Sequence, residues 1–394
     1  MVGLRTQFVH LYVKDNTEEP GGKFEDYGIY TQVEQLNKTA LKSHGLDSNG
    51  QLYKINSFEF YRYEDIIKKE DDAGYDKTAF EKMLEIKGDS DHTKLIDMLT
   101  DLNDYSIGIE DVLKEHFDEE NIVYWMAFQI LMGNVDTQNR NVYLYSPLNS
   151  DIWYFIAWDN DGCLMRPEYE LRNFSDQNSW EKGISNYWGN ILFQRCLKSR
   201  SFREKLNDAI LDLREYLNKD MLTSKIESYK NVLKPYLYLM PDAEYEPLTS
   251  EQYDQIAASL PDEIEKNYQL YLESLETPMP FYIGVPTIDG DKLKFNWDVS
   301  YDLDAEDITY SVEVAGDYLF RDVIYQNTTL TVPEAEMDLP KAGQYFVRVR
   351  ATNTSGKTQD AFDYYVTDEG KYYGMRCFYI TEDSTVEEDD YEEG

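Results

Sequence analysis

The chain has 394 residues, enough for two or three domains, and its 76 acidic against 38 basic residues give a formal net charge of −38. This charge argues against nucleic-acid backbones and anionic membranes as partners, and it favours a basic partner or simply a surface charged for solubility. No apolar run is long enough to cross a bilayer, and three cysteines and four histidines are too few and too scattered for a disulfide framework or a zinc site.

The first elements along the chain are predicted to be extended. Residues 7–13 and 27–34 alternate between apolar and polar side chains, as strands do. Asn37 follows as a suitable N-cap for a short helix over residues 38–44. Residues 52–55 read as another short extended segment.

The centre of the chain combines a buried helix with a hairpin. Residues 121–132 are apolar on nearly every side, which predicts a buried helix ended by Gly133. A loop over residues 134–140 is too polar for a core segment. Two aromatic and β-branched runs follow, residues 142–145 and 152–158, and the turn cluster between them indicates a β-hairpin.

Four polar side chains flank this hairpin. Asp136 and Asn141 precede it at a spacing of five, and Asp159 and Asp161 follow it. Protein kinases need such a set, in which one Asp accepts or orients the substrate hydroxyl, and an Asn and a second Asp hold magnesium on the ATP phosphates. The Asp–Asn spacing alone is a weak signal in so acidic a chain, but spacing, hairpin and Trp-Asp-x-Asp together are specific. The alternative to a catalytic site is a pair of solvated acidic loops at the mouth of an α+β domain.

A helical region follows and then stops. Apolar residues at i, i+3, i+4 spacing predict helices over residues 190–198, 201–216, 219–239 and 249–275. Ser201 with Glu204 fits a capping box, and Thr249 is a suitable N-cap. Residues 278–280, Pro-Met-Pro, form a stiff break that predicts a domain boundary.

Beyond this break the period changes to two. Turn clusters separate seven predicted strands, which indicate a β-sandwich: residues 281–285, 292–298, 308–314, 319–325, 328–332, 343–352 and 361–366. Trp297 on the second strand and Tyr345, placed like a corner tyrosine, resemble a fibronectin type III domain. Residues 368–380 could add one strand, whereas residues 381–394 are too charged to pack and are expected to be a disordered tail.

The central region resembles a known family. The matching segments are Phe117-Asp118, WMAFQ at 125–129, NVD at 134–136, NVYLY at 141–145 and WDND at 158–161. Together they resemble the core of the spore-coat CotH kinases, an atypical protein-kinase-like family. The resemblance implies that Asp136 is the catalytic Asp and that Asn141, Asp159 and Asp161 are metal ligands.

The resemblance also implies a hinge between two lobes. Gly28, Tyr30 and Glu34 fit the family's strand that runs into the hinge, so the backbone of Glu34 and Leu36 would meet adenine. The alternative is that Glu34 is only a polar residue at a strand end. No Gly-x-Gly-x-x-Gly precedes Glu34, so the small lobe is expected to be truncated. Lys54 follows the hinge, which is the wrong order for the usual phosphate-binding lysine, and we interpret it as an ordinary surface or cleft lysine.

The fold expected from these resemblances is α+β. It comprises a kinase-like domain over residues 1–277, with a truncated small lobe 1–35 and a mostly helical large lobe 36–277. A fibronectin type III-like sandwich follows over residues 278–367, and an acidic tail over residues 368–394 ends the chain.

The function implied is transfer of the ATP γ-phosphoryl group to Ser or Thr of a protein, with Mg²⁺ or Mn²⁺. The implied substrate is basic and Ser-rich, and transfer is expected to be weak because the phosphate loop is missing. A second hypothesis is a non-catalytic exported or cell-surface scaffold that keeps the fold. A third, carbohydrate binding through the 34 tyrosines, rests on composition alone. The sandwich favours an extracellular or cell-surface location, while the lack of a signal peptide favours the cytoplasm.

Overall fold

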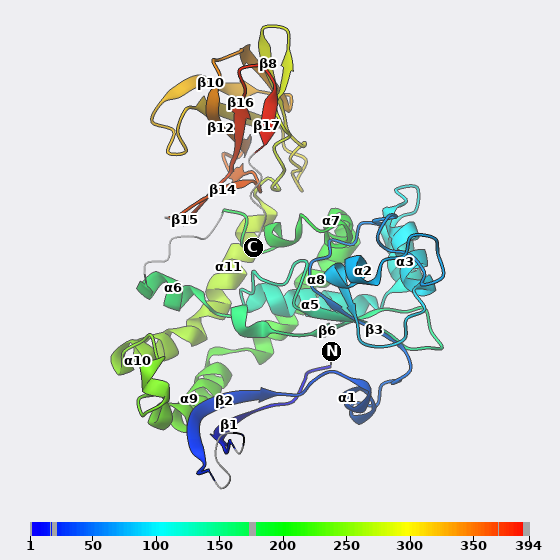
Figure 1. The fold of residues 1–394 in the computed structure, drawn as a ribbon, viewed down its shortest axis with the longest axis vertical. Coiled ribbons are helices and arrows are strands. Elements are labelled where there is room, and N and C mark those ends of the chain that lie inside the picture. Colours follow the sequence, from blue (N-terminus) through cyan, green and yellow to red (C-terminus); the bar gives the residue numbers. More distant parts are fainter. Residues whose placement is uncertain (1, 16, 18–21, 173–178, 369, 389–394) are drawn as a thin grey trace. The chain divides into compact units, whose positions relative to one another are not determined.

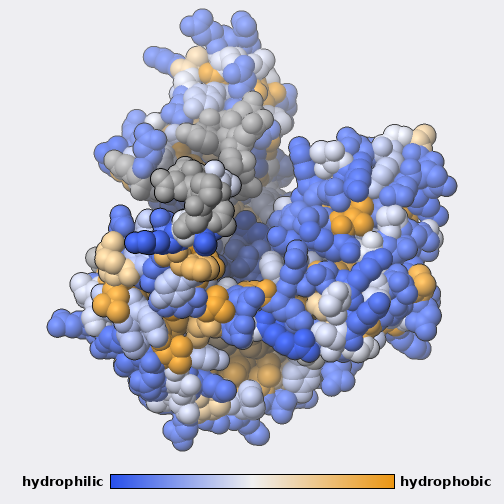
Figure 2. Space-filling view, turned by 60° about the horizontal axis from the view of Figure 1, so that its bottom comes forward, coloured by the Kyte–Doolittle hydropathy of each residue, from blue (hydrophilic) through white to orange (hydrophobic). Residues whose placement is uncertain are grey.

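The computed structural model describes residues 2–15, 17, 22–172, 179–368 and 370–388, and the chain divides into two compact units (Figure 1). One unit comprises Met1–Phe174 and Asn190–Tyr268, and the other comprises Ser175–Gly189 and Gln269–Gly394. The predicted α+β class is confirmed, since a mixed, largely helical region precedes an all-β one. The face of the molecule shown in Figure 2 is mainly hydrophilic, in keeping with the net charge. Within the described ranges no helix is long and apolar enough to span a membrane.

A two-stranded antiparallel sheet opens the first unit. Its strands, β1 (Thr6–Val13) and β2 (Glu25–Val33), confirm the first two predicted strands. Beside them lies the long helix α9 (Lys219–Leu237), as Figure 1 shows. The ring of Phe8 meets Tyr229 of this helix edge-on, with centroids 5.7 Å apart. The hairpin is therefore held by aromatic packing on a helix far away in the sequence.

The main sheet of this unit has four strands in the order β4-β3-β5-β6. Their bounds are Leu84–Ile86 for β4, Gln51–Ile55 for β3, Val142–Ser146 for β5 and Tyr154–Ala157 for β6. β5 and β6 form the predicted hairpin, with Val142 opposite Ala157. Because these two residues are the first of β5 and the last of β6, the segments before and after the hairpin meet at one end of the sheet.

Helix α5 (Glu119–Leu131) is the predicted buried helix, and it packs against the sheet. Trp125 is fully buried, stacked on Phe193 with centroids 5.5 Å apart and 5.0 Å from the ring of Phe155 on β6. Gly133 ends the helix at φ +62°, a left-handed conformation that favours glycine. This tight end turns the chain directly into the polar loop.

The remaining helices surround this centre. They are α1 (Lys38–Ser43), α2 (Lys77–Met83), α3 (Thr93–Asn103), α4 (Ile109–His116), α6 (Arg166–Arg172), α7 (Ile191–Lys198), α8 (Arg200–Tyr216), α10 (Ser250–Ser259) and α11 (Glu263–Leu275). Short 3₁₀ turns are η1 (Asn160–Gly162), η2 (Ser185–Tyr187), η3 (Asp242–Glu244) and η4 (Leu260–Asp262).

Two predicted N-caps are confirmed, whereas the predicted N-cap of α8 and the predicted continuous helix over residues 249–275 are wrong. Asn37 caps α1, and Thr249 caps α10 in a full capping box with Gln252. The cap of α8 is Ser199 rather than Ser201, because the helix already begins at the intervening Arg200. The single helix predicted over residues 249–275 is divided by η4, where Pro261 cannot donate the backbone hydrogen bond that a continuous helix needs.

The second unit is built around two antiparallel sheets. One has the order β11-β8-β7 and the other β10-β9-β12-β16-β17, with β13 beside β12. Bounds are β7 (Thr287–Asp289), β8 (Lys292–Asn296), β9 (Ile308–Ala315), β10 (Val323–Leu330), β11 (Glu334–Asp338), β12 (Gly343–Asn353), β13 (Thr358–Asp360), β16 (Met375–Ile380) and β17 (Val386–Glu388). A separate ribbon pairs β14 (Tyr364–Thr367) with β15 (Gly370–Tyr373). Both sheets contribute to one buried cluster, which includes Phe295, Trp297, Val312 and Val347.

Several strand predictions for this unit need correction. Residues 281–285 form only an isolated bridge, Ile283 to Trp297, and the two strands predicted over 319–332 are one strand, β10. Strands β7, β11 and β13 were not predicted. Residues 370–380, where one further strand was predicted, form two strands, β15 and β16. Residues 386–388 of the predicted disordered tail form β17, because Val386 packs against the same core as Phe378 and Ile380 despite acidic surroundings. The last predicted tail residues, 389–394, lie outside the described residues.

Candidate active site

The two polar loops meet at the end of the β5–β6 hairpin. Asn141 immediately precedes β5, and Asp159 lies two positions after β6 ends. Asp161 follows within η1, where it is exposed. The structure therefore brings together the four residues that the sequence nominated for catalysis and metal binding.

Asp136 and Asn141 are joined directly by hydrogen bonds. The Asn141 amide nitrogen donates to Asp136 Oδ2 at 2.8 Å and to the Asp136 carbonyl oxygen at 3.0 Å. Arg140 Nε lies 2.7 Å from the other carboxylate oxygen, in a pair that is largely exposed on both sides. The two residues thus close the loop by hydrogen bonds that use only the amide nitrogen of Asn141 and not its amide oxygen.

A buried polar bridge that the sequence analysis missed joins the two loops. Asn134 donates to Gln129 Oε1 at 3.0 Å and to Asn160 Oδ1 at 3.4 Å, and Gln129 also donates to Asn160 Oδ1 at 3.1 Å. Asn134 Oδ1 accepts from the backbone N–H of Asp136 at 3.2 Å. One available signal was Gln129 itself, a lone polar side chain inside an otherwise apolar helix and fully buried in the structure.

Backbone conformation at the site is unusual in two of the nominated residues. Asn141 has φ +57° and Asp159 has φ +53°, in the left-handed region that most side chains avoid. Asn and Asp tolerate this region better than other non-glycine residues, which fits their use here. Gly162 allows the close approach of the loops, since a Cβ there would lie 2.7 Å from Asn134 Oδ1.

Three charged neighbours and partial burial determine the pKa of Asp159. Partial desolvation and then the nearby carboxylate of Asp161 raise the pKa of Asp159, Asp136 adds to this, and the ammonium of Lys54 opposes it. Several negative charges thus converge on one place, with one positive charge among them. Such a place attracts cations.

The donor set fits magnesium or manganese bound together with phosphates. The available atoms are the Asn141 amide oxygen and the carboxylates of Asp159 and Asp161, all oxygens of the kind these ions prefer. Within the described residues no group of three His, Cys, Asp or Glu side chains could hold a metal ion alone. A divalent ion here would therefore need further oxygens, which a nucleotide's phosphates can supply.

The predicted hinge lies at the end of β2. Glu34 carries ion pairs from its carboxylate to Arg5 at 3.1 Å and His44 at 2.7 Å, and these partners hold its pKa below the usual range. Its backbone N–H donates to the Arg5 carbonyl at 2.8 Å. Leu36 is buried in an apolar cluster that includes Ile156. In the described part of the chain no residue bonds to the Glu34 carbonyl or the Leu36 N–H, the two groups that a hinge would offer.

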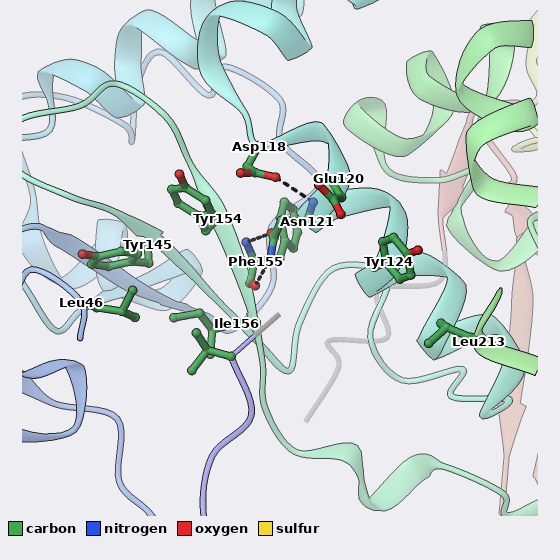
Figure 3. Close-up of a pocket in the computed structure, with 11 residues that line it drawn as sticks. Leu46, Asp118, Glu120, Asn121, Tyr124, Tyr145, Tyr154, Phe155, Ile156 and Leu213 are labelled. Atoms are coloured by element: carbon green, nitrogen blue, oxygen red, sulfur yellow. Dashed lines mark hydrogen bonds between the residues drawn. The ribbon is translucent and has the colours of Figure 1, made fainter. Parts of the chain in front are cut away.

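An apolar pocket of about 680 Å³ adjoins this cluster (Figure 3). Leu46, Tyr145 and Ile156 lie on one side of it, and Tyr124 and Leu213 on the other. The first three also belong to the cluster around Leu36.

The edge of β6 at this pocket is closed by a side chain. Asn121 donates to the Phe155 carbonyl at 3.1 Å and accepts from its N–H at 2.6 Å, as Figure 3 shows. The amide thus takes the place of a neighbouring strand and fixes the rim of the pocket on α5.

The segment after the acidic loop is anchored by an ion pair. Arg166 at the start of α6 donates to Glu263 at 3.0 Å and to Asn267 at 2.5 Å, both on α11. Glu263 is almost completely buried, and Asn267 donates onward to the Leu131 carbonyl at 2.9 Å. The end of α5 and the start of α6 are therefore tied to one helix.

An Asp and an Asn before the hairpin and an Asp after it follow the same order as the catalytic-loop and metal-binding residues of protein kinases. A comparison with protein families matches residues 1–271 to the CotH kinase protein family. Because this match spans more than half of the 394 residues, the chain belongs to the CotH kinase family. No curated protein matches the chain.

Proposed function

We propose that this protein transfers the γ-phosphoryl group of ATP to Ser or Thr hydroxyls of a protein substrate, with Mg²⁺ or Mn²⁺. The observation that carries the proposal is the joined loop pair, in which Asn141 is bonded to Asp136 and the Asn134 bridge holds Asn160, next to Asp159. Solvated acidic loops without a shared task would have no need of a buried bridge between them.

Asp136 would accept or orient the substrate hydroxyl. Its carboxylate is held by Asn141 and Arg140, so it is positioned before substrate arrives. Asn141, Asp159 and Asp161 would hold the divalent ion, whose contribution is to neutralise charge on the phosphates. The protein's own part is mainly positioning and electrostatic preorganisation.

The pocket of Figure 3 supports a nucleoside site. Ile156, which lines it, lies three residues before Asp159, and Leu36 of the proposed hinge shares its apolar cluster. A base bound here would direct its phosphates along the sheet towards the acidic loop. A basic, Ser-containing substrate would be drawn by the net charge of −38.

The test is transfer of radiolabelled phosphate from ATP to a basic, Ser-containing protein with Mg²⁺ or Mn²⁺. Asp136→Asn should abolish transfer and leave the fold intact. The exposed Asp97 on α3 offers a matched control, because Asp97→Asn makes the same change away from the loops. Transfer that survives Asp136→Asn would mean that the active site lies elsewhere.

A second candidate is a non-catalytic binding or scaffold protein that keeps the fold. One observation favours it: both carboxylate oxygens of Asp136 already have partners, Arg140 and Asn141. In that case the wild type would show no transfer above the Asp136→Asn level under any metal, while nucleotide could still bind.

The second unit supports a fibronectin type III-like module of an exported or cell-surface protein. Its strand order places three strands in one sheet and the central strands β9, β12 and β16 in the other. Tyr345 donates its hydroxyl to the Lys341 carbonyl at 2.9 Å, as the predicted corner tyrosine would.

A further inference from the structure

Lys54 lies on the middle of the sheet that carries the candidate site. It belongs to β3, where it pairs with Tyr143 of β5, and Tyr143 in turn pairs with Ile156 of β6. Directly paired residues of antiparallel strands project from the same face of a sheet. Lys54 and the pocket-lining Ile156 therefore share one face, the face that also carries the cluster around Leu36.

The ammonium group of Lys54 has no partner within the described residues. It forms no ion pair or hydrogen bond there, although its side chain is half-buried. Its cross-strand neighbour on β4 is Glu85, but that carboxylate is paired with Lys87. The stem of Lys54 is thus partly packed on the sheet while its ammonium has no partner in the described part of the chain, so the charge is available to an anionic ligand.

Lys54 lies near the end of the sheet where the two polar loops begin. The next residue, Ile55, pairs with Val142, and Val142 pairs with Ala157, the last residue of β6 before the acidic loop. The other nearby cation, Arg140, is already paired with Asp136. Lys54 is thus placed between the apolar pocket and the acidic loop, where the phosphates of a nucleotide would pass.

We infer that Lys54 binds the phosphates of the nucleotide, so that the sheet supplies the phosphate-binding cation in this chain. The sequence order argued for an ordinary surface or cleft lysine, but strand pairing, not order along the chain, decides which groups face the site. The inference rests on the proposed function. It assigns Lys54 to phosphate contact rather than to balancing the charge of Asp159.

Calorimetric titration of the full chain separates these roles, with Mg·ATP and adenosine as ligands. A hydrogen bond to a charged group supports about a tenfold affinity difference, so Lys54→Met should weaken Mg·ATP binding by about tenfold. Adenosine binding should stay unchanged. Lys82→Met is the matched control, because Lys82 is exposed on α2 and its loss changes the net charge equally. Lys54→Arg should restore most of the ATP affinity.

A titration with Mn²⁺ alone gives a second readout. Removing a cation beside Asp159 should leave Mn²⁺ affinity unchanged or increase it, while ATP affinity falls. If Lys54→Met weakens Mn²⁺, adenosine and ATP together, Lys54 only supports the fold of the site and the inference is overturned.

The remaining outcomes distinguish the two proposals. If the wild type binds Mg·ATP and Lys54→Met binds it equally well, the role of Lys54 is wrong and the proposed function stands. If the wild type binds no nucleotide at all, the proposed function fails and the assignment of Lys54 fails with it.

Discussion

Asn134 shows how one side chain can set the geometry of the whole site. Its amide oxygen accepts a hydrogen bond from the backbone N–H of Asp136, and its amide nitrogen donates to Gln129 on α5 and to Asn160 of the acidic loop. It is buried, so water cannot replace these partners if they are lost. The site therefore depends on a residue that would not itself touch substrate.

Replacing Asn134 by Ala should destabilise the protein by about 1–3 kcal/mol, the cost of leaving buried polar partners unsatisfied. The expected measurement is a lower urea midpoint for unfolding. Asn49→Ala removes the same group from an exposed position and should change the stability by less than about 0.5 kcal/mol. Equal effects of the two substitutions would contradict the bridging role.

His92 should make the free energy of unfolding depend on pH. Burial lowers its pKa, although the carboxylates of Glu70, Asp91 and Asp89 oppose this, and Tyr53 OH lies 2.7 Å from its Nδ1. The unfolded chain takes up a proton near pH 6.5 and the folded chain only below that, so stability is lost as pH falls below about 6.5.

The measurement is the denaturant midpoint between pH 7.5 and 5 for the wild type and His92→Gln. The wild type should lose more stability on acidification than the variant, which has no titrating group there. A variant curve parallel to the wild-type curve would show that His92 does not carry this dependence.

At the scale of the elements, helix α11 fixes the start of α6 through a buried ion pair. Its buried residue Glu263 pairs with Arg166 of α6 and also with Lys266 at 2.6 Å. The start of α6, just after the acidic loop, is thereby fixed to the helical part of the unit.

Glu263→Gln should cost roughly 3 kcal/mol, because it leaves Arg166 without its buried counter-charge. Glu265→Gln is a matched control on the same helix, since Glu265 pairs with Arg214 while more than half exposed and should cost less than about 1 kcal/mol. Urea unfolding of both variants tests the ranking, and a larger effect at Glu265 would contradict it.

Elements set by local pattern were predictable, and those set by distant contacts were not. The apolar run of α5 and the β5–β6 hairpin follow from neighbouring residues. The Asp136–Asn141 pair could be nominated from spacing. By contrast, the Gln129–Asn160 contact joins residues 31 apart and the pairing of Lys54 with Tyr143 joins residues far apart in the chain. β17 was not predicted because two of its three residues are acidic, which argues against a packed strand, although Val386 packs against the core.

On the scale of the molecule, the second unit needs more of the chain than the predicted boundaries include. β16 pairs along β12 and buries Phe378 in the core, yet it lies beyond residue 367. Residues 179–189 also belong to this unit, where Trp180 meets Phe362 edge-on at 5.1 Å and Trp188 stacks on Tyr301 at 5.5 Å.

Both sheets and the whole buried cluster lie within residues 277–388, so this fragment should unfold cooperatively with a β-type circular dichroism spectrum even without residues 179–189, whereas residues 277–367 should not. The shorter fragment lacks β16 and leaves one edge of β12 and part of the core open to water. Cooperative unfolding of the shorter fragment with equal stability would show that β16 is dispensable.

The central claim is that the two loops form one nucleotide–metal site in which binding and transfer use different residues. Binding of Mn²⁺·ATP, followed by electron paramagnetic resonance of the bound Mn²⁺, tests it most directly. Asp159→Asn should lose the bound signal, Asp136→Asn should keep it although transfer is abolished, and Asp97→Asn should match the wild type. Wild-type binding by Asp159→Asn would contradict the account, because the acidic loop would then have no part in holding the metal and its nucleotide.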